Sequence, residues 1–357
     1  MTAPQARRNE VRMEPEHKRR VRYAGTHPRR FEEKYKELDP EKYQDEAEKI
    51  RRSGKTPAGT HVPILVDEIL DFLRIQPGQI GLDATLGYGG HSRRMLEQLN
   101  GQGHLYACDV DPIESEKTRL RLERLGYGPE IFTLRRMNFA RLDEAAPGVR
   151  FDFVLADLGV SSMQIDDPSR GFTFKADGPL DLRLDPTSGV TAAQRLRELD
   201  EEELADMLRE NADEPYADEI ARTVLKRLRQ GGPVDTTKAL AALVEQALDF
   251  LPAAERKETV KKSCQRTFQA LRIDVNNEFE SLYSLLDKLP DVLKSGGRVA
   301  ILTFHSGEDR MVKKAFRQQR RAGLYSACAD EVIRPGAAEC FRNPRAKPAK
   351  LRWAIRA

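Results

Sequence analysis

Residues 83–91 read DATLGYGGH, a glycine-rich turn that follows a short apolar run and precedes the helical pattern SRRMLEQL. Glycines in a turn between a strand and a helix let backbone N–H groups approach a ligand closely. Asp109 ends the next apolar run, where a carboxylate can accept hydrogen bonds from ribose hydroxyls. These residues together predict a site for a nucleotide or a nucleoside.

The chemistry of the turn favours one cofactor over another. Gly87 and Gly89 fit the first two positions of the dinucleotide fingerprint G-x-G-x-x-G/A, but Ser92 stands at the third. The Asp83 carboxylate would repel a pyrophosphate, whereas it suits the ammonium and sulfonium groups of S-adenosylmethionine. We therefore expect S-adenosyl-L-methionine as the cofactor, and an NAD-dependent oxidoreductase is the disfavoured alternative.

Two further residues fit a nucleoside site. Phe139 follows the third apolar run, where an aromatic ring can stack on adenine, although a core position is equally compatible with its pattern. Asp157 ends the fourth run, and ligands of open α/β sheets bind at the carboxyl ends of the strands. The segment LGVSSMQIDD after Asp157 is richer in polar side chains than a simple connection requires.

The elements that position these residues alternate along the chain. Leu65, Ile69, Phe72 and Leu73 share one face of a helix expected within residues 61–75. Strands are expected at 79–84, 104–110, 130–137, 151–157 and 298–304, with amphipathic helices at 92–99 and 112–125. Residues 350–357 are expected to pair antiparallel at the edge of the sheet. This alternation predicts an α/β, Rossmann-like fold with a mostly parallel sheet.

The pattern also divides the chain into four segments. Residues 1–60 are highly charged and are expected to form a flexible extension, with one charged helix around 41–52, that either is solvated or follows a phosphate backbone. The α/β domain is expected over 61–169 and 271–357. Residues 170–270 show helical patterns only, which predicts a helical insertion.

The composition narrows the class of protein. Charged residues make up 33% of the chain and the net charge is +3, which permits an RNA partner without requiring one. Cys108, Cys264, Cys328 and Cys340 have no metal-ligand spacing and are expected to be reduced thiols. The sequence shows no apolar signal segment and no membrane-spanning run. We therefore expect a cytoplasmic protein without a membrane partner.

Six segments together resemble one known family. They are HVPILVDE (61–68), DATLGYGGHS (83–92), DLGVSSMQIDDPSRGFTFKADGPLDLRLD (157–185), RTFQALRIDVNNE (266–278), FHSGEDRMVK (304–313) and NPRAKPAKLR (343–352). In this order they are similar to the RsmH (MraW) family of 16S rRNA cytosine-N4 methyltransferases. The resemblance covers roughly residues 61–357.

The resemblance implies a function and a set of contacts. The fold would be that of a class I S-adenosylmethionine-dependent methyltransferase domain over 61–169 and 271–357, with an inserted helical domain for substrate recognition over 170–270. The reaction would be methylation of N4 of a P-site cytosine in the decoding centre of the small ribosomal subunit. The cofactor contacts would be Gly89, Gly90, His91, Asp109, Phe139, Asp157 and Gln164, of which His91 and Gln164 rest on the resemblance alone. The partner would be 16S rRNA, no metal would be needed, and a homodimer is left open.

The residues that act on the base are less strongly indicated. Asp157, by its side chain or a neighbouring carbonyl, is the candidate catalytic residue, placed between the cofactor and the amino group. Phe172, Phe174 and Phe304 are candidates for stacking on the base, although core packing suits each of them. Candidates for phosphate contacts are Arg170, Arg183, Arg266, Arg272 and Arg310. His305, Glu308 and Asp309 are expected to be polar contacts to the substrate or structural hydrogen bonds.

This sequence departs from the family pattern at two places within the resemblance. Gly307 stands where the family usually has leucine, and SCQR (263–266) replaces a P-A-T-R-like phrase. Two other functions also stay open: a ribosome-assembly factor that binds RNA without catalysis, and a methyltransferase that acts on another RNA.

Overall fold

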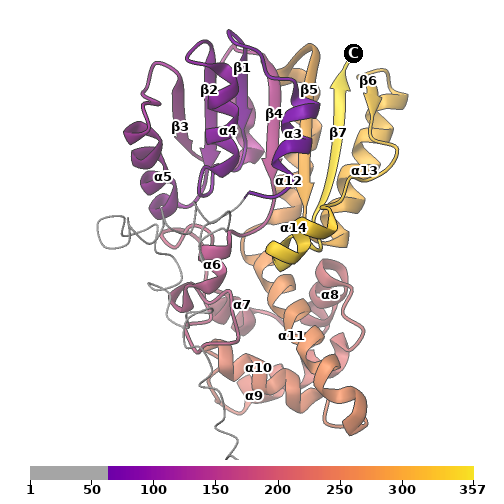
Figure 1. Cartoon of the computed structure of the whole chain (residues 1–357). Helices are drawn as coiled ribbons and strands as arrows, with labels where there is room; N and C mark the ends of the chain where they lie inside the picture. The colour runs from indigo at the N-terminus through magenta and orange to yellow at the C-terminus, as the bar shows by residue number, and fades with distance from the viewer. Residues whose placement is uncertain (1–62) are drawn as a thin grey trace, which may run out of the picture. The chain divides into compact units, whose positions relative to one another are not determined.

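The computed structural model describes residues 63–357, so the expected N-terminal extension and its helix around 41–52 lie outside the described residues. One seven-stranded sheet has the order β3-β2-β1-β4-β5-β7-β6 (Figure 1). Its strands are β1 (Ile80–Asp83), β2 (His104–Asp109), β3 (Phe132–Arg136), β4 (Phe151–Asp157), β5 (Leu293–Thr303), β6 (Tyr325–Cys328) and β7 (Lys350–Arg356). The first five in this spatial order run parallel. The predicted α/β, Rossmann-like fold is confirmed.

The edge of the sheet differs from the prediction. Strand β7 pairs antiparallel with β5, as expected, but it is not the edge strand. Strand β6 pairs with the other side of β7 and ends the sheet. Its sequence YSAC spans four residues, which is too short to show the alternation that identifies a strand.

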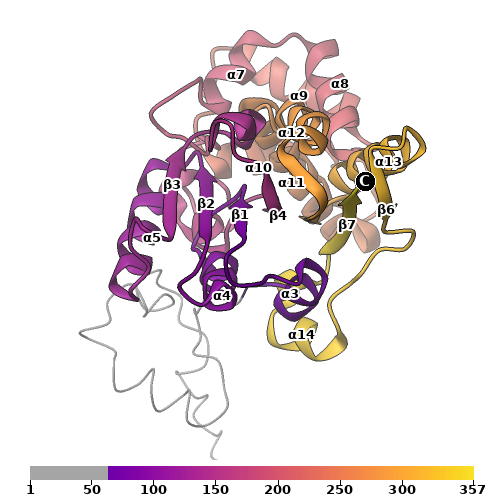
Figure 2. The ribbon, with the colours of Figure 1, turned by 90° about the horizontal axis from the view of Figure 1, so that it is seen from above.

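Helices cover both faces of the sheet. On one face lie α3 (Val66–Leu73), α4 (Gly90–Leu99) and α5 (Pro112–Arg124), and on the other lie α12 (Glu278–Val292) and α13 (Ser306–Arg321) (Figure 2). Strand β4 serves both cores, because Phe153 and Leu155 face the first group of helices while Val154 and Ala156 face the second. Each large apolar side chain buried in this way contributes about 1.5–3 kcal/mol to folding. This packing fixes where the ends of the strands lie.

The helical patterns form a separate core. Helices α7 (Ala192–Glu198), α8 (Glu201–Ala212), α9 (Ala217–Arg229), α10 (Thr237–Ala247) and α11 (Ala253–Val275) pack around buried residues such as Leu208, Ile220 and Leu271. The boundary placed at residue 270 falls inside α11. That helix continues to Val275, and Asn277, with φ of 49°, separates it from α12. In Figure 1 this region lies beyond one end of the sheet, and the short helix α6 (Ser162–Asp166) lies at that same end.

None of the helices within residues 63–357 combines the length and the apolar character that crossing a membrane requires.

Candidate functional site

A cavity of about 700 Å³ lies where the carboxyl ends of β1, β2 and β4 face the helical region. The loops after these strands form one wall, and residues of α11, α12 and the segment after α6 form the other. The residues lining it include every cofactor contact expected from the sequence: Gly89, Gly90, His91, Asp109, Phe139, Asp157 and Gln164. The fold therefore brings together side chains from four separate segments.

The glycine turn is held tightly against α5. Gly89 has φ of 75°, and a Cβ atom there would come within 2.6 Å of Thr118 Cγ2. The Thr118 hydroxyl donates a hydrogen bond of 2.7 Å to the Gly87 carbonyl, so α5 fixes the turn from behind. Glycine at 89 is required both by the left-handed backbone and by this close approach.

Asp109 organises the loops after β1 and β2. Its carboxylate accepts hydrogen bonds from the Gly87 N–H at 2.7 Å and from the Asp111 N–H at 2.8 Å. Burial raises the pKa of Asp109 to about 6, and the two N–H donors counteract that shift only in part. Because each carboxylate oxygen has more than one lone pair, Asp109 can still accept hydrogen bonds from a ligand in the cavity.

Asp83 does not have the role that its position in the motif suggested. It is 1% exposed and is not among the residues that line the cavity. The Ser92 hydroxyl donates to it at 2.6 Å and the Thr85 N–H at 3.1 Å, and burial raises its pKa. The inference that Asp83 faces a cationic ligand was therefore wrong. This buried carboxylate instead stabilises the turn by accepting hydrogen bonds from Ser92 and Thr85.

The His91 ring lies between two hydrogen-bond acceptors. Its Nε2 lies 3.0 Å from the Ile64 carbonyl oxygen and its Nδ1 lies 3.4 Å from Asp157 Oδ2. Because both neighbours only accept, the ring satisfies both when each nitrogen carries a proton. Burial alone would lower the pKa of His91, but the Asp157 carboxylate and the Ile64 carbonyl raise it above its ordinary value.

The Asp157 carboxylate has one oxygen engaged and one without a partner. Oδ2 faces His91, and the Asp157 N–H donates a 2.6 Å hydrogen bond to the Thr85 hydroxyl. Oδ1 is buried and has no hydrogen-bond partner among the described residues. A buried acceptor without a donor costs free energy unless a ligand supplies one, so this oxygen marks a place for a donor in the cavity.

Gln164 is held by its own helix and by Asp111. Its Oε1 accepts from the Ser161 N–H as part of a capping box at the start of α6, and its Nε2 donates to Asp111 Oδ2 at 2.9 Å. Asp111 also receives Arg170 Nη1 at 2.7 Å and caps α5. Although burial raises the pKa of Asp111, Arg170 and Gln164 hold it below its ordinary value. Asp111 could not be identified from the sequence, because its partners Gln164 and Arg170 are far away along the chain.

This network corrects one assignment. Arg170 is buried and also donates to the Arg183 and Leu184 carbonyls, so the hypothesis that Arg170 meets phosphate was wrong. Arg183 and Arg272 pair with Asp181 and Glu278. Arg310 forms an exposed ion pair with Asp213, and the Arg266 guanidinium lies 3.9 Å from Glu214. Only these last two of the proposed phosphate contacts are substantially exposed.

The aromatic candidates all reach the cavity. Phe172, Phe174 and Phe304 line it while also packing on the cores behind them, and the Phe174 ring centroid lies 5.4 Å from that of Phe268. Phe139 lines it from the loop after β3. Core packing and cavity lining are thus not alternatives for these rings.

Glu278, His305 and Glu308 line the cavity and form a cluster of two carboxylates and one imidazole. One side-chain oxygen or nitrogen of each residue lies within 4.8 Å of those of the other two. Arg272 contacts both oxygens of Glu278, at 2.7 and 2.8 Å, and the Phe304 N–H donates to Glu308. The charge of Glu278 is therefore balanced by Arg272, and Glu308 receives a backbone donor. Asp309 pairs instead with Lys350 and Arg352, away from the cavity.

The two departures from the family pattern have visible surroundings. A Cβ atom at Gly307 would lie 2.7 Å from Phe279 Cζ, so the Phe279 ring occupies the space that a larger residue would need. The Ser263 hydroxyl donates to Glu214 at 2.8 Å inside the helical region, and Gln265 lines the cavity. The first departure therefore changes packing near His305, and only part of the second reaches the cavity.

The sequence pattern of the MraW methylase family matches residues 58–357. The chain is 62% identical to the ribosomal RNA small subunit methyltransferase H 1 of Lachnoclostridium phytofermentans, over 96% of this chain and 94% of that protein. It is 59% identical to the protein of the same name in Agathobacter rectalis, over 96% and 99%. The ribosomal RNA small subunit methyltransferase H of Koribacter versatilis is 41% identical over 83% of this chain and 94% of its own. The first two alignments therefore extend into residues 1–60.

Proposed function

The chain belongs to the MraW methylase family, and we propose that it transfers a methyl group from S-adenosylmethionine to N4 of a P-site cytosine in the decoding centre of 16S rRNA. The names of the relatives support ribosomal RNA of the small subunit as the substrate. The choice of N4 rests on the resemblance stated above and on the chemistry of the cavity.

The residues around the glycine turn suit a nucleoside with a cationic tail. When bound, S-adenosylmethionine supplies a methyl group activated by its sulfonium charge. Asp109 accepts hydrogen bonds from ribose hydroxyls, and Phe139 offers a ring face for adenine. The Gly89 and Gly90 backbone allows close approach, and His91, Asp157 and Gln164 complete the wall. The buried Oδ1 of Asp157 fits a group that carries N–H donors.

That oxygen is the observation on which the proposal depends. The lone pair of an exocyclic amino nitrogen is delocalised into the cytosine ring, so the nitrogen is a weak nucleophile. An acceptor that takes a hydrogen bond from the amino group increases the electron density on nitrogen as the new N–C bond forms and the bond between sulfur and the methyl group breaks. The same acceptor can take up the proton that the methylated nitrogen must then lose. Asp157 Oδ1 is such an acceptor, and His91 and Thr85 fix its direction. Holding the amino nitrogen in line with the methyl group of the cofactor can supply a further 7–11 kcal/mol, roughly, of the barrier reduction.

The cavity also has to accept a base removed from its stack. Unstacking costs a few kcal/mol, which is lower in a region without regular pairing. Phe172, Phe174 and Phe304 line the cavity and are the candidates for stacking on the base, which is worth about 1–3 kcal/mol per base. Arg272 and Glu278 are fixed to each other beside these rings and offer polar edges to the base.

The test uses small ribosomal subunits from cells that lack this gene. The protein is incubated with these subunits and labelled S-adenosylmethionine, and mass spectrometry of nuclease digests locates the new methyl group. We expect N4-methylcytidine at the decoding centre. A methyl group on another base or another RNA would show that the substrate is different.

The alternative is an assembly factor that binds RNA without catalysis. It predicts cofactor and subunit binding but no transfer to assembled subunits, to precursors or to naked rRNA. The intact glycine turn and the engaged His91–Asp157 pair favour the enzyme, because binding alone does not need an oriented carboxylate beside the cofactor.

A further inference from the structure

Phe341 is the most exposed of the large apolar side chains found on the surface of the described residues. It is 88% exposed, compared with 69% for Tyr283 and 62% for Phe250. It lies in α14 (Ala337–Arg342), a short helix before the last strand. A single exposed apolar residue is common on protein surfaces, so Phe341 becomes informative only through its surroundings.

The segment that carries Phe341 is fixed to the rest of the site. The Leu65 N–H donates to Glu339 Oε1 at 2.9 Å, which attaches α14 to the start of α3. Asn343 caps the short helical turn Pro344–Ala346. Arg345 in that turn donates to Asp166 Oδ1 at 2.7 Å and to the Ser162 carbonyl at 3.2 Å, both in α6. The exposed ring therefore sits on an anchored support.

This support borders the cavity. Pro344, Arg345 and Pro348 line it directly. Figures 1 and 2 both show α14 beside α3, and Figure 1 shows it at the end of the sheet that faces the helical region. A strand of substrate whose target base enters the cavity would therefore pass over this segment.

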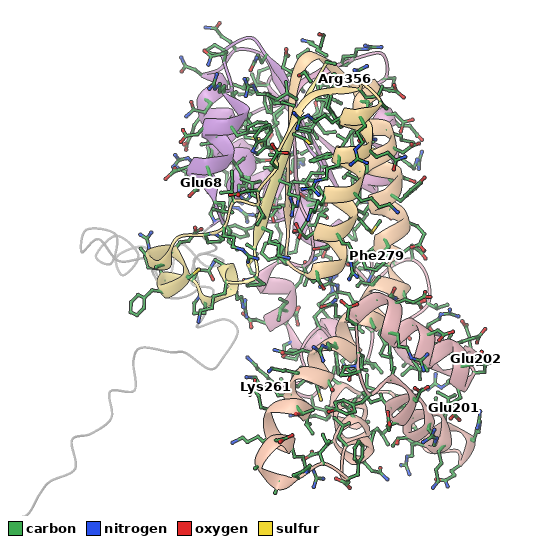
Figure 3. All side chains as sticks on the ribbon, turned by 90° about the vertical axis from the view of Figure 1, so that its right-hand side faces the viewer. Glu68, Glu201, Glu202, Lys261, Phe279 and Arg356 are labelled. Atoms are coloured by element: carbon green, nitrogen blue, oxygen red, sulfur yellow. The ribbon has the colours of Figure 1, made fainter. Side chains whose placement is uncertain are left out.

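The segment is also strongly basic. Residues 334–350 contain the basic residues Arg334, Arg342, Arg345, Lys347 and Lys350 against the single acid Glu339. Arg342 and Lys347 are exposed, and neither has an ion pair among residues 63–357. In Figure 3 Lys261 of α11 points to one side of the helical region, and the acidic pair Glu201 and Glu202 lies on the opposite side. Arg345 and Lys350 are paired with Asp166 and Asp309, so Arg342 and Lys347 are the basic groups of this segment that can meet phosphates.

We infer that Phe341 is a stacking platform for a base of single-stranded RNA next to the methylated nucleotide, with Arg342 and Lys347 contacting the phosphates on either side of it. Exposed aromatic rings combined with cations on the same segment are how proteins hold single-stranded nucleic acid, because every base has a face to stack and every nucleotide has a charge. This inference rests on the proposed RNA substrate and adds a second contact outside the cavity.

The first test compares Phe341→Ala with Phe250→Ala, which removes another exposed phenylalanine that is not among the residues lining the cavity. We expect Phe341→Ala to raise KM for the small subunit by about 10- to 100-fold, in line with the loss of one stacked base. It should leave kcat and the Kd for S-adenosylmethionine unchanged. Phe341→Tyr should retain the wild-type KM because it keeps the ring, and Phe250→Ala should behave as wild type.

The second test observes stacking directly. Tryptophan at this position in the Phe341→Trp variant should lose fluorescence when a single-stranded RNA containing the target sequence is added, whereas the Phe250→Trp variant should not. The loss should weaken with salt, and Arg342→Ala with Lys347→Ala should reduce that salt dependence.

The outcomes separate this inference from the proposed function. If the wild-type protein methylates subunits but Phe341→Ala has the same KM and Phe341→Trp shows no quenching, the platform does not exist. If quenching occurs but no RNA is methylated, the platform stands and the proposed reaction is wrong. If Phe341→Ala weakens binding to subunits and leaves binding to naked RNA unchanged, the ring contacts a ribosomal protein and the inference is overturned.

Discussion

The His91 imidazole lies between the Asp157 carboxylate, 3.4 Å from Nδ1, and the Ile64 carbonyl, 3.0 Å from Nε2. One side chain therefore connects the chain just before α3, the glycine turn and the end of β4. The consequence is that Asp157 has one oxygen fixed toward His91 and the other left for a ligand.

Replacing Asp157 by asparagine should reduce kcat more than it reduces cofactor affinity. The variant keeps the shape of the side chain but removes the charge that strengthens the hydrogen bond to the amino group. Hydrogen bonds to charged groups are worth about 1.5–3 kcal/mol, which corresponds to about 10- to 100-fold in kcat. Single-turnover methylation and calorimetric binding of S-adenosylmethionine measure the two effects separately. Unchanged turnover would remove Asp157 from the reaction.

Replacing His91 by glutamine should reduce stability most at acidic pH. The raised pKa of His91 means that the folded state holds its proton more tightly than the unfolded state, so the contribution is complete below the ordinary value of 6.5. It is lost as pH rises through the higher pKa of the folded state. Urea unfolding of wild type and variant from pH 5.5 to 9 should therefore give a difference that shrinks as pH rises. A difference that is constant or that grows would show that His91 is neutral.

Binding of S-adenosylmethionine should weaken as pH falls through about 6. Asp109 has its pKa raised to about 6 by burial, so below that value it gains a proton and accepts hydrogen bonds from ribose less well. Asp109→Asn should bind more weakly at neutral pH and should lose this part of the pH dependence. Titration calorimetry at pH 5 and pH 8 with both proteins provides the check. The same pH dependence in the variant would assign the titration to another group.

Removing Arg170 should destabilise the protein far more than removing an exposed arginine. Asp111 is 1% exposed, and Arg170→Met leaves its charge buried without its cationic partner. Breaking a buried pair costs about 3–5 kcal/mol, whereas an exposed pair is worth about 0–1 kcal/mol. Arg310→Met, which breaks the exposed pair with Asp213, is the matched control. The double variant Asp111→Asn with Arg170→Met should recover part of the stability, and equal losses in Arg170→Met and Arg310→Met would contradict the prediction.

Local order along the chain was enough to predict the fold. The apolar runs that end at Asp83, Asp109 and Asp157, separated by amphipathic helices, predict parallel strands whose carboxyl ends meet at one edge. Glycines and acids at those ends therefore had to lie together, and the cavity lies there. The helical region was visible for the same reason, since 3.6-residue periodicity is a local property. Strand β6 was missed because four residues carry too little pattern.

The direction in which each polar side chain points was decided only by the tertiary structure. Asp83 and Asp157 both end strands of the sheet, yet one is turned inward to Ser92 and the other opens on the cavity. Arg170 lies in a segment suited to RNA contact but is bound to Asp111, fifty-nine positions earlier in the chain. The sequence thus determined which elements form and which residues gather at the end of the sheet, because periodicity and turn chemistry act over a few neighbouring residues. Pairing between charges that are distant in the sequence depends on packing. The tertiary structure alone therefore decided which polar side chains at the end of the sheet are paired with other residues and which remain for a ligand.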